Sequence, residues 1–296
     1  MKSPILPFLL LALVGTLASA QTPIDQTRAV DADARIDVAN IKGSISITGW
    51  DQPQVTISGT LGRGSKGLSV EGDARHLRIK VEAPERGWFN WGSDTSMGDT
   101  TLVLKVPRGA TLDIDSVSAD VELAGVAGSA LTAATVSGKL RLDSSAARVD
   151  IDSVSGDVDF TGPAGKAEVE TVSGSIRVRG LGGEVDLETV SGDIDADLGS
   201  YRRLDAQTVS GDINVRGTPA NDGDIQLESM SGDLQLQLPE AIPAKLKAST
   251  FSGRIRSDFG AGSGDTDAKR LEATLGAGSA QMRLETFSGD IEIRKH

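Results

Sequence analysis

Hydrophobic and polar residues alternate along most of this chain in short runs, and the runs meet at a recurring Val-Ser-Gly segment. In residues 185–196, VDLETVSGDIDA, the alternation holds up to Thr189 and resumes from Ile194. A period of two residues is typical of a strand with one buried face. Inward positions are odd-numbered up to Thr189 and even-numbered from Val190 onward. The pattern therefore predicts two strands joined at a corner, with the Val190 side chain inside.

The segment returns at a nearly constant interval. Its serines are separated by 19, 18, 18, 18, 19, 21, 21 and 36 residues, and they are Ser118, Ser137, Ser155, Ser173, Ser191, Ser210, Ser231, Ser252 and Ser288. A unit that cannot bury its apolar face alone predicts a stack in which each coil covers the next. The last interval is twice 18, which predicts a coil without the segment near Thr274, Leu275 and Gly276. The same frame places Val154 and Val209 inside their coils.

Two further positions repeat around the corner. Gly192 shares the inward parity, and a larger side chain there would collide with the neighbouring coil. Ala119 is the exception in the first full unit. A serine or threonine stands two residues before each motif serine, as Thr189 does before Ser191. Stacked hydroxyls at this position predict hydrogen bonds along a column.

The outward charges predict the direction of stacking. Four residues after the motif serine the charge alternates in sign, through Glu122, Arg141, Asp159, Arg177 and Asp195. In a parallel stack each of these charges has opposite neighbours about 4.8 Å away, whereas an antiparallel meander gives no reason for the alternation. We therefore predict an all-β fold, a single-chain parallel β-solenoid of about ten coils of 18–21 residues with an N-terminal β capping region.

The chain before the repeats is organised differently. Residues 1–20 hold one lysine, an apolar run and the small residues Ala-Ser-Ala, which is typical of a signal peptide that is cleaved before Gln21. Residues 21–110 contain strand patterns without the period and are expected to form the N-terminal β capping region. Residues 111–296 are expected to form the β-solenoid repeat domain. The sequence NIKGSISI at residues 40–47 weakly resembles the repeated segment.

The amino-acid composition excludes several kinds of attachment and argues against some kinds of partner. The 296 residues include 35 glycines, ten aromatic residues and no cysteine, and the formal net charge is -12. Without cysteine the chain has no disulfide and no lipid attached at the cleavage site. The negative charge argues against nucleic acid as a partner. No stretch after residue 20 is apolar for long enough to predict a membrane span.

The units SVSGDVDF, TVSGSIRV, TVSGDIDA, TVSGDINV and TFSGDIEI resemble those of the putative-adhesin family, exported bacterial repeat proteins of unknown function. The resemblance covers residues 40–296, and it includes LKVPRGATLDI before the repeats and LGAGSAQMRLETFSGDIEI at the end. It implies a β-solenoid of the cell envelope, periplasmic or secreted to the cell surface, without known catalysis. It supplies no active-site residues.

A column of aspartates is the first candidate for chemistry. One residue after the motif glycine stand Asp120, Asp157, Asp193, Asp212, Asp233 and Asp290. Repeated carboxylates suit calcium, which prefers oxygen ligands. However, Lys139, Ser175 and Arg254 interrupt the column, and an aspartate after glycine commonly supports a turn. The structural interpretation is favoured, and we expect no metal and no cofactor.

An acidic strip is the best candidate surface for a partner. The residues five and three positions before the motif serine include Asp113, Asp115, Asp150, Asp152, Glu168, Glu170, Asp186, Glu188 and Asp205. Such a strip favours basic peptides or cations. The alternative is a solvated sheet face that keeps the chain soluble and prevents chance pairing with other chains.

The segment WFNW is the other candidate surface. Trp88, Phe89 and Trp91 lie in a stretch rich in glycine and serine that predicts a loop. Exposed rings in a loop can bind a sugar or a protein. Alternatively, the rings fold down as the hydrophobic plug of the cap.

Catalysis has little support in the sequence. His76 and His296 are too few for a histidine-based metal cluster, no GxSxG elbow occurs, and no helix pattern follows GRGSKG at 62–67. We expect a non-enzymatic exported β-solenoid, an adhesin-like or envelope-stress-associated binding scaffold for a protein, peptide or glycan. One alternative is a polysaccharide-acting enzyme with paired carboxylates. Another is a structural envelope protein that self-associates end to end, because TFSGDIEIRKH stops almost at a strand.

Overall fold

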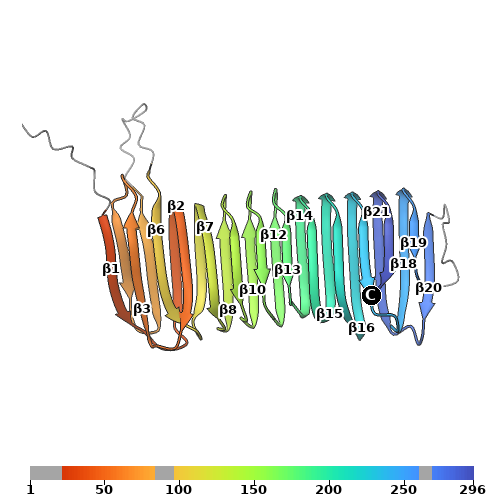
Figure 1. The fold of residues 1–296 in the computed structure, drawn as a ribbon, viewed down its shortest axis with the longest axis horizontal. Helices are drawn as coiled ribbons and strands as arrows, with labels where there is room; N and C mark the ends of the chain where they lie inside the picture. Colours follow the sequence, from red (N-terminus) through yellow and green to blue (C-terminus); the bar gives the residue numbers. More distant parts are fainter. Residues whose placement is uncertain (1–21, 84–96, 260–268) are drawn as a thin grey trace, which may run out of the picture.

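The computed structural model describes residues 22–83, 97–259 and 269–296, and these residues form strands and connecting turns without a helix. The strands stack side by side along one long axis (Figure 1). The prediction of an all-β parallel solenoid is confirmed. The predicted signal peptide at 1–20 and the aromatic residues Trp88, Phe89 and Trp91 lie outside the described residues.

Each central coil contributes one strand on either side of the Val-Ser-Gly corner. The strands that lead into the corner pair in parallel and form the entry sheet: residues 111–116 of β7 (Thr111–Val126), β8 (Ala130–Thr135), β10 (Arg148–Ser153), β12 (Lys166–Thr171), β14 (Gly183–Ser191), 203–210 of β15 (Ile194–Ser210) and 224–231 of β16 (Ile213–Ser231). The strands that leave the corner form the exit sheet: residues 121–126 of β7, β9 (Leu140–Ser144), β11 (Val158–Thr161), β13 (Ile176–Arg179), 194–197 of β15, 213–216 of β16 and β17 (Leu234–Leu238).

The register follows the repeat, as the alternating charges predict. On the exit sheet, Arg141 pairs in register with Glu122 and Asp159, and Arg177 pairs with Asp159 and Asp195. The Arg141 guanidinium lies 3.3 Å from the Glu122 carboxylate. That of Arg177 lies 3.9 Å from Asp159 and 3.6 Å from Asp195. Opposite charges therefore face each other between successive coils.

The core between the two sheets is a thin layer of mainly aliphatic side chains. Ile151, Val158 and Leu187 are fully buried, and Phe160 and Tyr201 are the largest buried side chains. The Tyr201 hydroxyl has no partner among the described residues, and burial raises the pKa of this phenol. Because each coil is too thin to form a core by itself, its stability depends on the coils on either side.

The predicted burial of Val154, Val190 and Val209 is wrong. These side chains are 46%, 46% and 45% exposed, although the residues around them have the predicted burial. The alternation of the entry strand continues one residue further than expected, and the turn occurs over residues 192–193. Thr189 is therefore the last inward residue before the corner, and Ile194 is the first one after it.

The space inside the corner is filled by backbone, which explains the exposed valines. A Cβ atom on Gly192 would lie 2.0 Å from the carbonyl oxygen of Gly174 in the preceding coil. At Gly211 it would lie 2.0 Å from the carbonyl oxygen of Gly192. The predicted collision at the motif glycine is confirmed, because the coils approach each other too closely there for any side chain.

The column of serine and threonine hydroxyls binds the corner differently from the prediction. The Thr189 hydroxyl donates to the Gly174 carbonyl at 3.2 Å, and the Thr208 hydroxyl donates to the Gly192 carbonyl at 3.3 Å. These hydroxyls bond to glycine carbonyls and not to each other. The Ser153 hydroxyl donates to the Gly156 carbonyl of its own corner at 3.1 Å, and the buried hydroxyls of Thr135 and Thr171 have no hydrogen-bond partner among the described residues.

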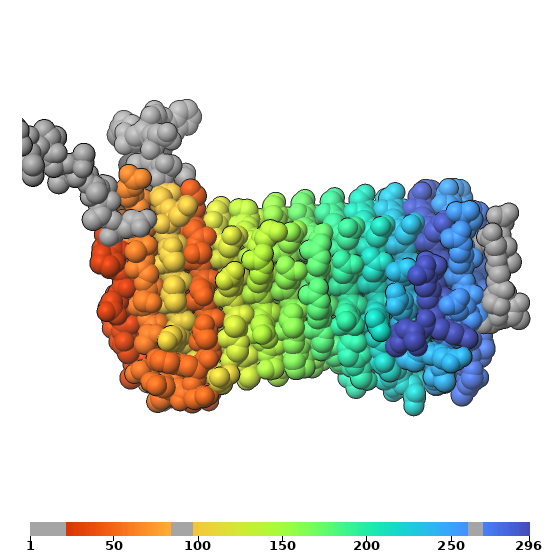
Figure 2. Space-filling view, in the orientation of Figure 1, coloured from red at the N-terminus to blue at the C-terminus, as the bar shows by residue number. Residues whose placement is uncertain are grey.

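The C-terminal coil lies inside the stack and not at its end. β21 (Ala280–Ser288) pairs in parallel with β16 on one side and β18 (Ala244–Ser252) on the other. β22 (Ile291–Lys295) lies in the same way between β17 and β19 (Ile255–Ser257). Beyond them, β20 (Arg270–Leu275) runs antiparallel to β18. The dark blue C-terminal residues accordingly lie before the tip of the rod (Figures 1 and 2).

Two expectations about this end need correction. Thr274 and Leu275 belong to β20, and Gly276 follows that strand, so these residues are not a coil that has lost its motif. An antiparallel edge strand needs no Val-Ser-Gly corner. Residues 286–296 also leave no strand free for end-to-end association, because β22 is enclosed between β17 and β19.

At the other end the parallel stack continues into residues before the repeats. β2 (Arg35–Trp50) pairs with β7, with Lys42 opposite Ser118 and Gly43 opposite Ala119. The repeat-like segment at 40–47 therefore forms part of a coil. β5 (His76–Glu82) and β6 (Thr100–Pro107) extend the two sheets one step further. Three strands pair antiparallel beyond them: β4 (Gly67–Gly72) with β5, β3 (Gln54–Leu61) with β6, and β1 (Thr22–Ala29) with β3. Antiparallel strands therefore cover both sheets at this end, whereas at the opposite end the antiparallel strand β20 covers the entry sheet.

The corner contact predicts a strong effect of one added methyl group. Gly192→Ala should lower the free energy of unfolding by about 1–3 kcal/mol or more, because the coils must separate to accept the new Cβ. Gly199→Ala is the matched control, since its Cβ would lie 3.5 Å from the Leu181 carbonyl oxygen, an ordinary contact. Urea unfolding measures the free energy of unfolding of both variants. Equal stabilities for the two variants would contradict the packing described here.

Candidate functional site

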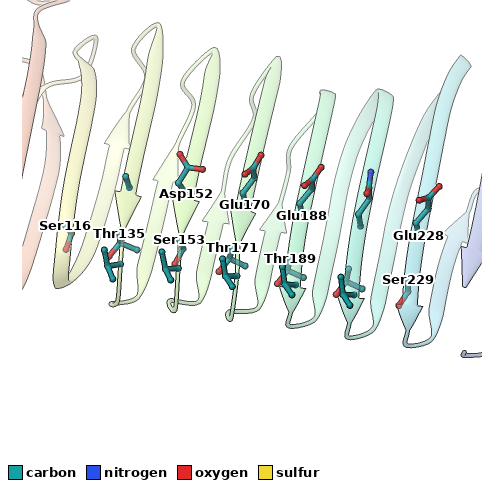
Figure 3. A pocket seen from close by; sticks show the side chains of 18 of the residues that line it. Ser116, Thr135, Asp152, Ser153, Glu170, Thr171, Glu188, Thr189, Glu228 and Ser229 are labelled. Carbon is teal, nitrogen blue, oxygen red and sulfur yellow. The ribbon is translucent and has the colours of Figure 1, made fainter. Parts of the chain in front are cut away.

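A long groove runs along the entry sheet beside the corner. It has a volume of about 2270 Å³ and crosses the coils from β2 to β18. Each coil contributes the three residues before its motif serine, as Glu188, Thr189 and Val190 do in β14. In Figure 3, Asp152, Glu170, Glu188 and Glu228 form one row, and the hydroxyl residues form a parallel row closer to the corner. The groove is therefore a feature of the repeat and is not confined to one coil.

One wall of the groove is a row of exposed apolar side chains, which we call the apolar ladder. In spatial order it consists of Val117, Val136, Val154, Val172, Val190, Val209, Met230, Phe287 and Phe251. The rings of Phe251 and Phe287 stack with their centroids 4.8 Å apart and an interplanar angle of 8°. Phe251 is 73% exposed despite this stacking. Single exposed apolar residues are ordinary on a protein surface, but a contiguous row marks an interaction site.

The other wall carries a column of acids, which we call the acidic wall. Its acidic members are Asp115, Asp152, Glu170, Glu188, Glu228 and Glu285, with Ala134 and Gln207 between them. In the described part of the chain, Asp115, Asp152, Glu170 and Glu188 form no ion pair. Burial, together with neighbouring carboxylates, raises the pKa of Asp115, Asp152 and Glu170. Glu285, at one end of the wall, lies 4.0 Å from Arg283, so the unneutralised negative charge is concentrated between Asp115 and Glu188.

Basic side chains line the groove at its two ends. Lys66 and Lys80 lie at the β4–β5 end, and Lys269 and Arg270 lie at the β20 end. Among the described lining residues from β7 to β21 there is no lysine or arginine. The groove therefore has an acidic centre and basic ends.

A second acidic column runs beside the groove and is partly neutralised. It contains Asp113, Asp150, Glu168, Asp186 and Asp205, two residues before the acidic wall in each strand. Arg148 lies 3.8 Å from Asp150, and Arg203 lies 3.8 Å from Asp205. Burial and the neighbouring Asp205 raise the pKa of Asp186, which has one oxygen buried without a partner in the described structure.

The structure thus divides the predicted acidic strip into two columns. Asp152, Glu170 and Glu188 line the groove, whereas Asp150, Glu168 and Asp186 lie in the second column beside it. The other predicted binding residues, Trp88, Phe89 and Trp91, lie outside the described residues.

Sequence reasoning missed the apolar ladder, because it placed the motif valines inside. One signal was available. Met230, Phe251 and Phe287 replace valine in three units, and a buried column in a thin core would not accept such a change of volume. Variable size at a repeated position therefore indicates a side chain that is free in solvent.

The aspartate column has a structural role in the described coils. The Asp193 carboxylate accepts a hydrogen bond from the backbone N–H of Asp212 at 3.0 Å, and Asp212 accepts one from Asp233 at 2.8 Å. Each carboxylate therefore joins its coil to the next one. The backbone N–H of Ser175 lowers the pKa of Asp157, and that of Arg254 lowers the pKa of Asp290.

Other candidate chemistry is sparse in the described residues. His76 bonds to the Asp37 carboxylate at 2.7 Å, near the end of the rod. Within residues 22–83, 97–259 and 269–296, no group of three or more His, Asp or Glu side chains is arranged to hold a metal ion. In the same ranges no helix is long and apolar enough to cross a membrane.

Comparison with known proteins identifies relatives of this chain. Residues 34–294 match the family described as Toastrack DUF4097. Nothing matches among the curated proteins. Similar solved structures include a putative adhesin from Bacteroides fragilis (13% identity, 94% of this chain and 98% of that chain, TM-score 0.42) and one from Parabacteroides merdae (11%, 92% and 96%, 0.44). A putative lipid binding protein from Parabacteroides distasonis is similar at 11% identity over 93% of this chain and 97% of that chain, with a TM-score of 0.37.

Two sets of carboxylates predict opposite effects of pH on stability. The raised pKa values of Asp152 and Glu170 mean that their charge destabilises the folded protein, and this penalty disappears as the pH falls through those values. The pKa values of Asp157 and Asp290 are lowered, so these ionised carboxylates stabilise the fold at any pH above the ordinary carboxyl pKa of 3.8. This stabilisation is lost as the pH falls through the lowered values. We expect Tm to rise as the pH falls from neutral through the raised pKa values, and to fall again as the pH drops below 3.8 through the lowered ones.

Circular dichroism melts across this pH range test the prediction. Asp152→Asn combined with Glu170→Gln should reduce the rise. The matched pair Asp159→Asn and Asp195→Asn removes the same charge from the exit sheet and should leave more of the rise. If both double variants reduce it equally, the effect comes from net charge and not from the acidic wall.

Proposed function

We propose that this chain, which belongs to the Toastrack DUF4097 family, is an exported, non-enzymatic binding scaffold of the cell envelope that holds an elongated partner in its groove. The apolar ladder carries this proposal, because it is a continuous row of exposed side chains along one wall from Val117 to Phe251. Keeping such a row in water costs free energy, which contact with a partner removes. The role is adhesin-like in that one long face makes the contact.

The repetition of the groove supports an elongated partner. Each coil adds one further apolar side chain about 4.8 Å along the rod. A compact ligand would cover two or three of these positions, whereas a long one gains contact area with every coil. Export is supported by the signal-like residues 1–20.

The repetition also favours binding over catalysis. A polysaccharide-cleaving enzyme needs one carboxylic acid and one carboxylate in different roles. Asp152, Glu170 and Glu188 occupy equivalent positions in successive coils, so the described acidic wall distinguishes no pair. Equivalent groups suit continuous contact with a long partner better than a reaction at one place.

The binding proposal is tested with a fluorescein-labelled 22-residue helical peptide that carries leucine on one face and glutamine on the other. Fluorescence anisotropy should show saturable binding, and an 11-residue peptide of the same pattern should bind at least about tenfold more weakly because it covers half of the ladder. Val172→Gln combined with Val190→Gln should weaken binding of the long peptide about tenfold or more.

Val103→Gln is the matched control, since Val103 is 39% exposed but lies outside the groove. It should leave affinity unchanged. Equal binding of both peptide lengths, or full affinity in the Val172 and Val190 double variant, would contradict the proposal. Release of reducing ends from purified cell-wall glycan would favour the enzyme alternative instead.

A further inference from the structure

The acidic wall differs from the other charged face of the rod in how its charge is balanced. On the exit sheet, Arg141 and Arg177 alternate with acids and lie within 4.0 Å of them. On the acidic wall, Glu170 stands between Asp152 and Glu188 in register, with no basic residue between them. Like charges directly opposite on neighbouring strands destabilise a sheet. From Asp152 to Glu188 the described chain places no basic side chain against this column, so its negative charge favours a cationic partner.

The basic residues at the two ends of the groove limit the length of the stretch that a cationic partner can occupy. The acidic stretch begins at Asp115 on β7 and ends at Glu285 on β21, with Lys80 and Arg270 lying beyond it. The strands in between are β7, β8, β10, β12, β14, β15, β16 and β21, which makes seven steps. At about 4.8 Å per step the acidic stretch is roughly 34 Å long.

The backbone of the groove decides the conformation of the partner. An extended peptide usually gains affinity by adding a strand to a free sheet edge. From β2 to β18 the strands of the groove are paired on both sides, as β12 is with β10 and β14, so this part of the groove offers no edge to such a peptide. A helix satisfies its own backbone, and about 22 residues span 34 Å at 1.5 Å per residue.

The spacing of the two walls also suits a helix. Glu188 and Val190 are two residues apart on the outer face of one strand, which separates their columns by about 7 Å. A helix is about 10 Å across, so one that lies along the rod can rest its apolar stripe on the ladder and direct lysine or arginine from the adjacent side to the acids. A second copy of this chain fits poorly, because the described lining of its groove between β7 and β21 offers no lysine or arginine to the acidic wall.

We infer that the groove binds a cationic amphipathic α-helix of about 22 residues, with its apolar stripe on the ladder and its basic residues along the acidic wall. This inference rests on the function proposed above and names the class of partner. The helix can belong to a larger protein or be a free peptide, since the same contacts serve both.

Three labelled 22-residue helical peptides test the inference, with one leucine face in common and lysine, glutamine or glutamate beside it. At low salt the lysine peptide should bind about tenfold more tightly than the glutamine peptide, which corresponds to about three exposed ion pairs. The glutamate peptide should bind most weakly. Salt should reduce the preference for lysine.

Asp152→Asn, Glu170→Gln and Glu188→Gln together should abolish the preference for the lysine peptide over the glutamine peptide. The matched triple variant Glu122→Gln, Asp159→Asn and Asp195→Asn removes the same charge from the exit sheet and should retain most of the preference. If both triple variants lose it equally, or if the three peptides bind alike, the inference is overturned while the proposed groove function stands.

The remaining outcomes are also informative. If no peptide depends on Val172 and Val190, the proposed function itself fails. If sedimentation shows that the protein alone dimerises and that Val190→Lys prevents it, the occupant is a second copy and the helix inference is overturned.

Discussion

The close contact between successive corners is the constraint on which this structure depends. The motif glycines stack so closely that a Cβ on Gly192 would lie 2.0 Å from the carbonyl oxygen of the coil below. The same corner is held by the Thr189 hydroxyl on the Gly174 carbonyl and by the Asp193 carboxylate on the Asp212 backbone N–H. Each of these interactions joins one coil to a neighbour, so each specifies the parallel register as well as stabilising it.

The groove follows from that constraint. Because backbone and a hydroxyl residue fill the inside of the corner, the residue before the motif serine must point outward, and in most coils it is valine. Exact register then aligns these side chains into the apolar ladder and aligns Asp152, Glu170 and Glu188 into the acidic wall. A binding surface as long as the rod thus arises from a unit of about twenty residues. The proposed function therefore needs no structural element beyond the two columns of side chains that the stacking aligns.

Much of this fold could be predicted from the sequence, because the period, the inward glycine and the alternating charges at Arg141 and Arg177 each depend on parallel stacking. The burial of Val190 was predicted wrongly, since an apolar residue beside a strand was assumed to continue the core. Periodicity cannot show how much space the backbone occupies inside a corner. The insertion of β21 between β16 and β18 was equally hidden, because chain order carries no direct information about spatial order. The acidic residues were found, but their division into a groove wall and a second column required the register.

The outward position of the motif valines is tested most directly by thiol accessibility, which the absence of native cysteine makes simple. An alkylating agent would be added to three folded variants, Val190→Cys, Ser191→Cys and Leu187→Cys. Ser191 is the exposed reference position, and Leu187 is the fully buried one. The account predicts that the thiol at position 190 reacts at a rate close to that at position 191. Protection of position 190 to the degree seen at position 187 would contradict it.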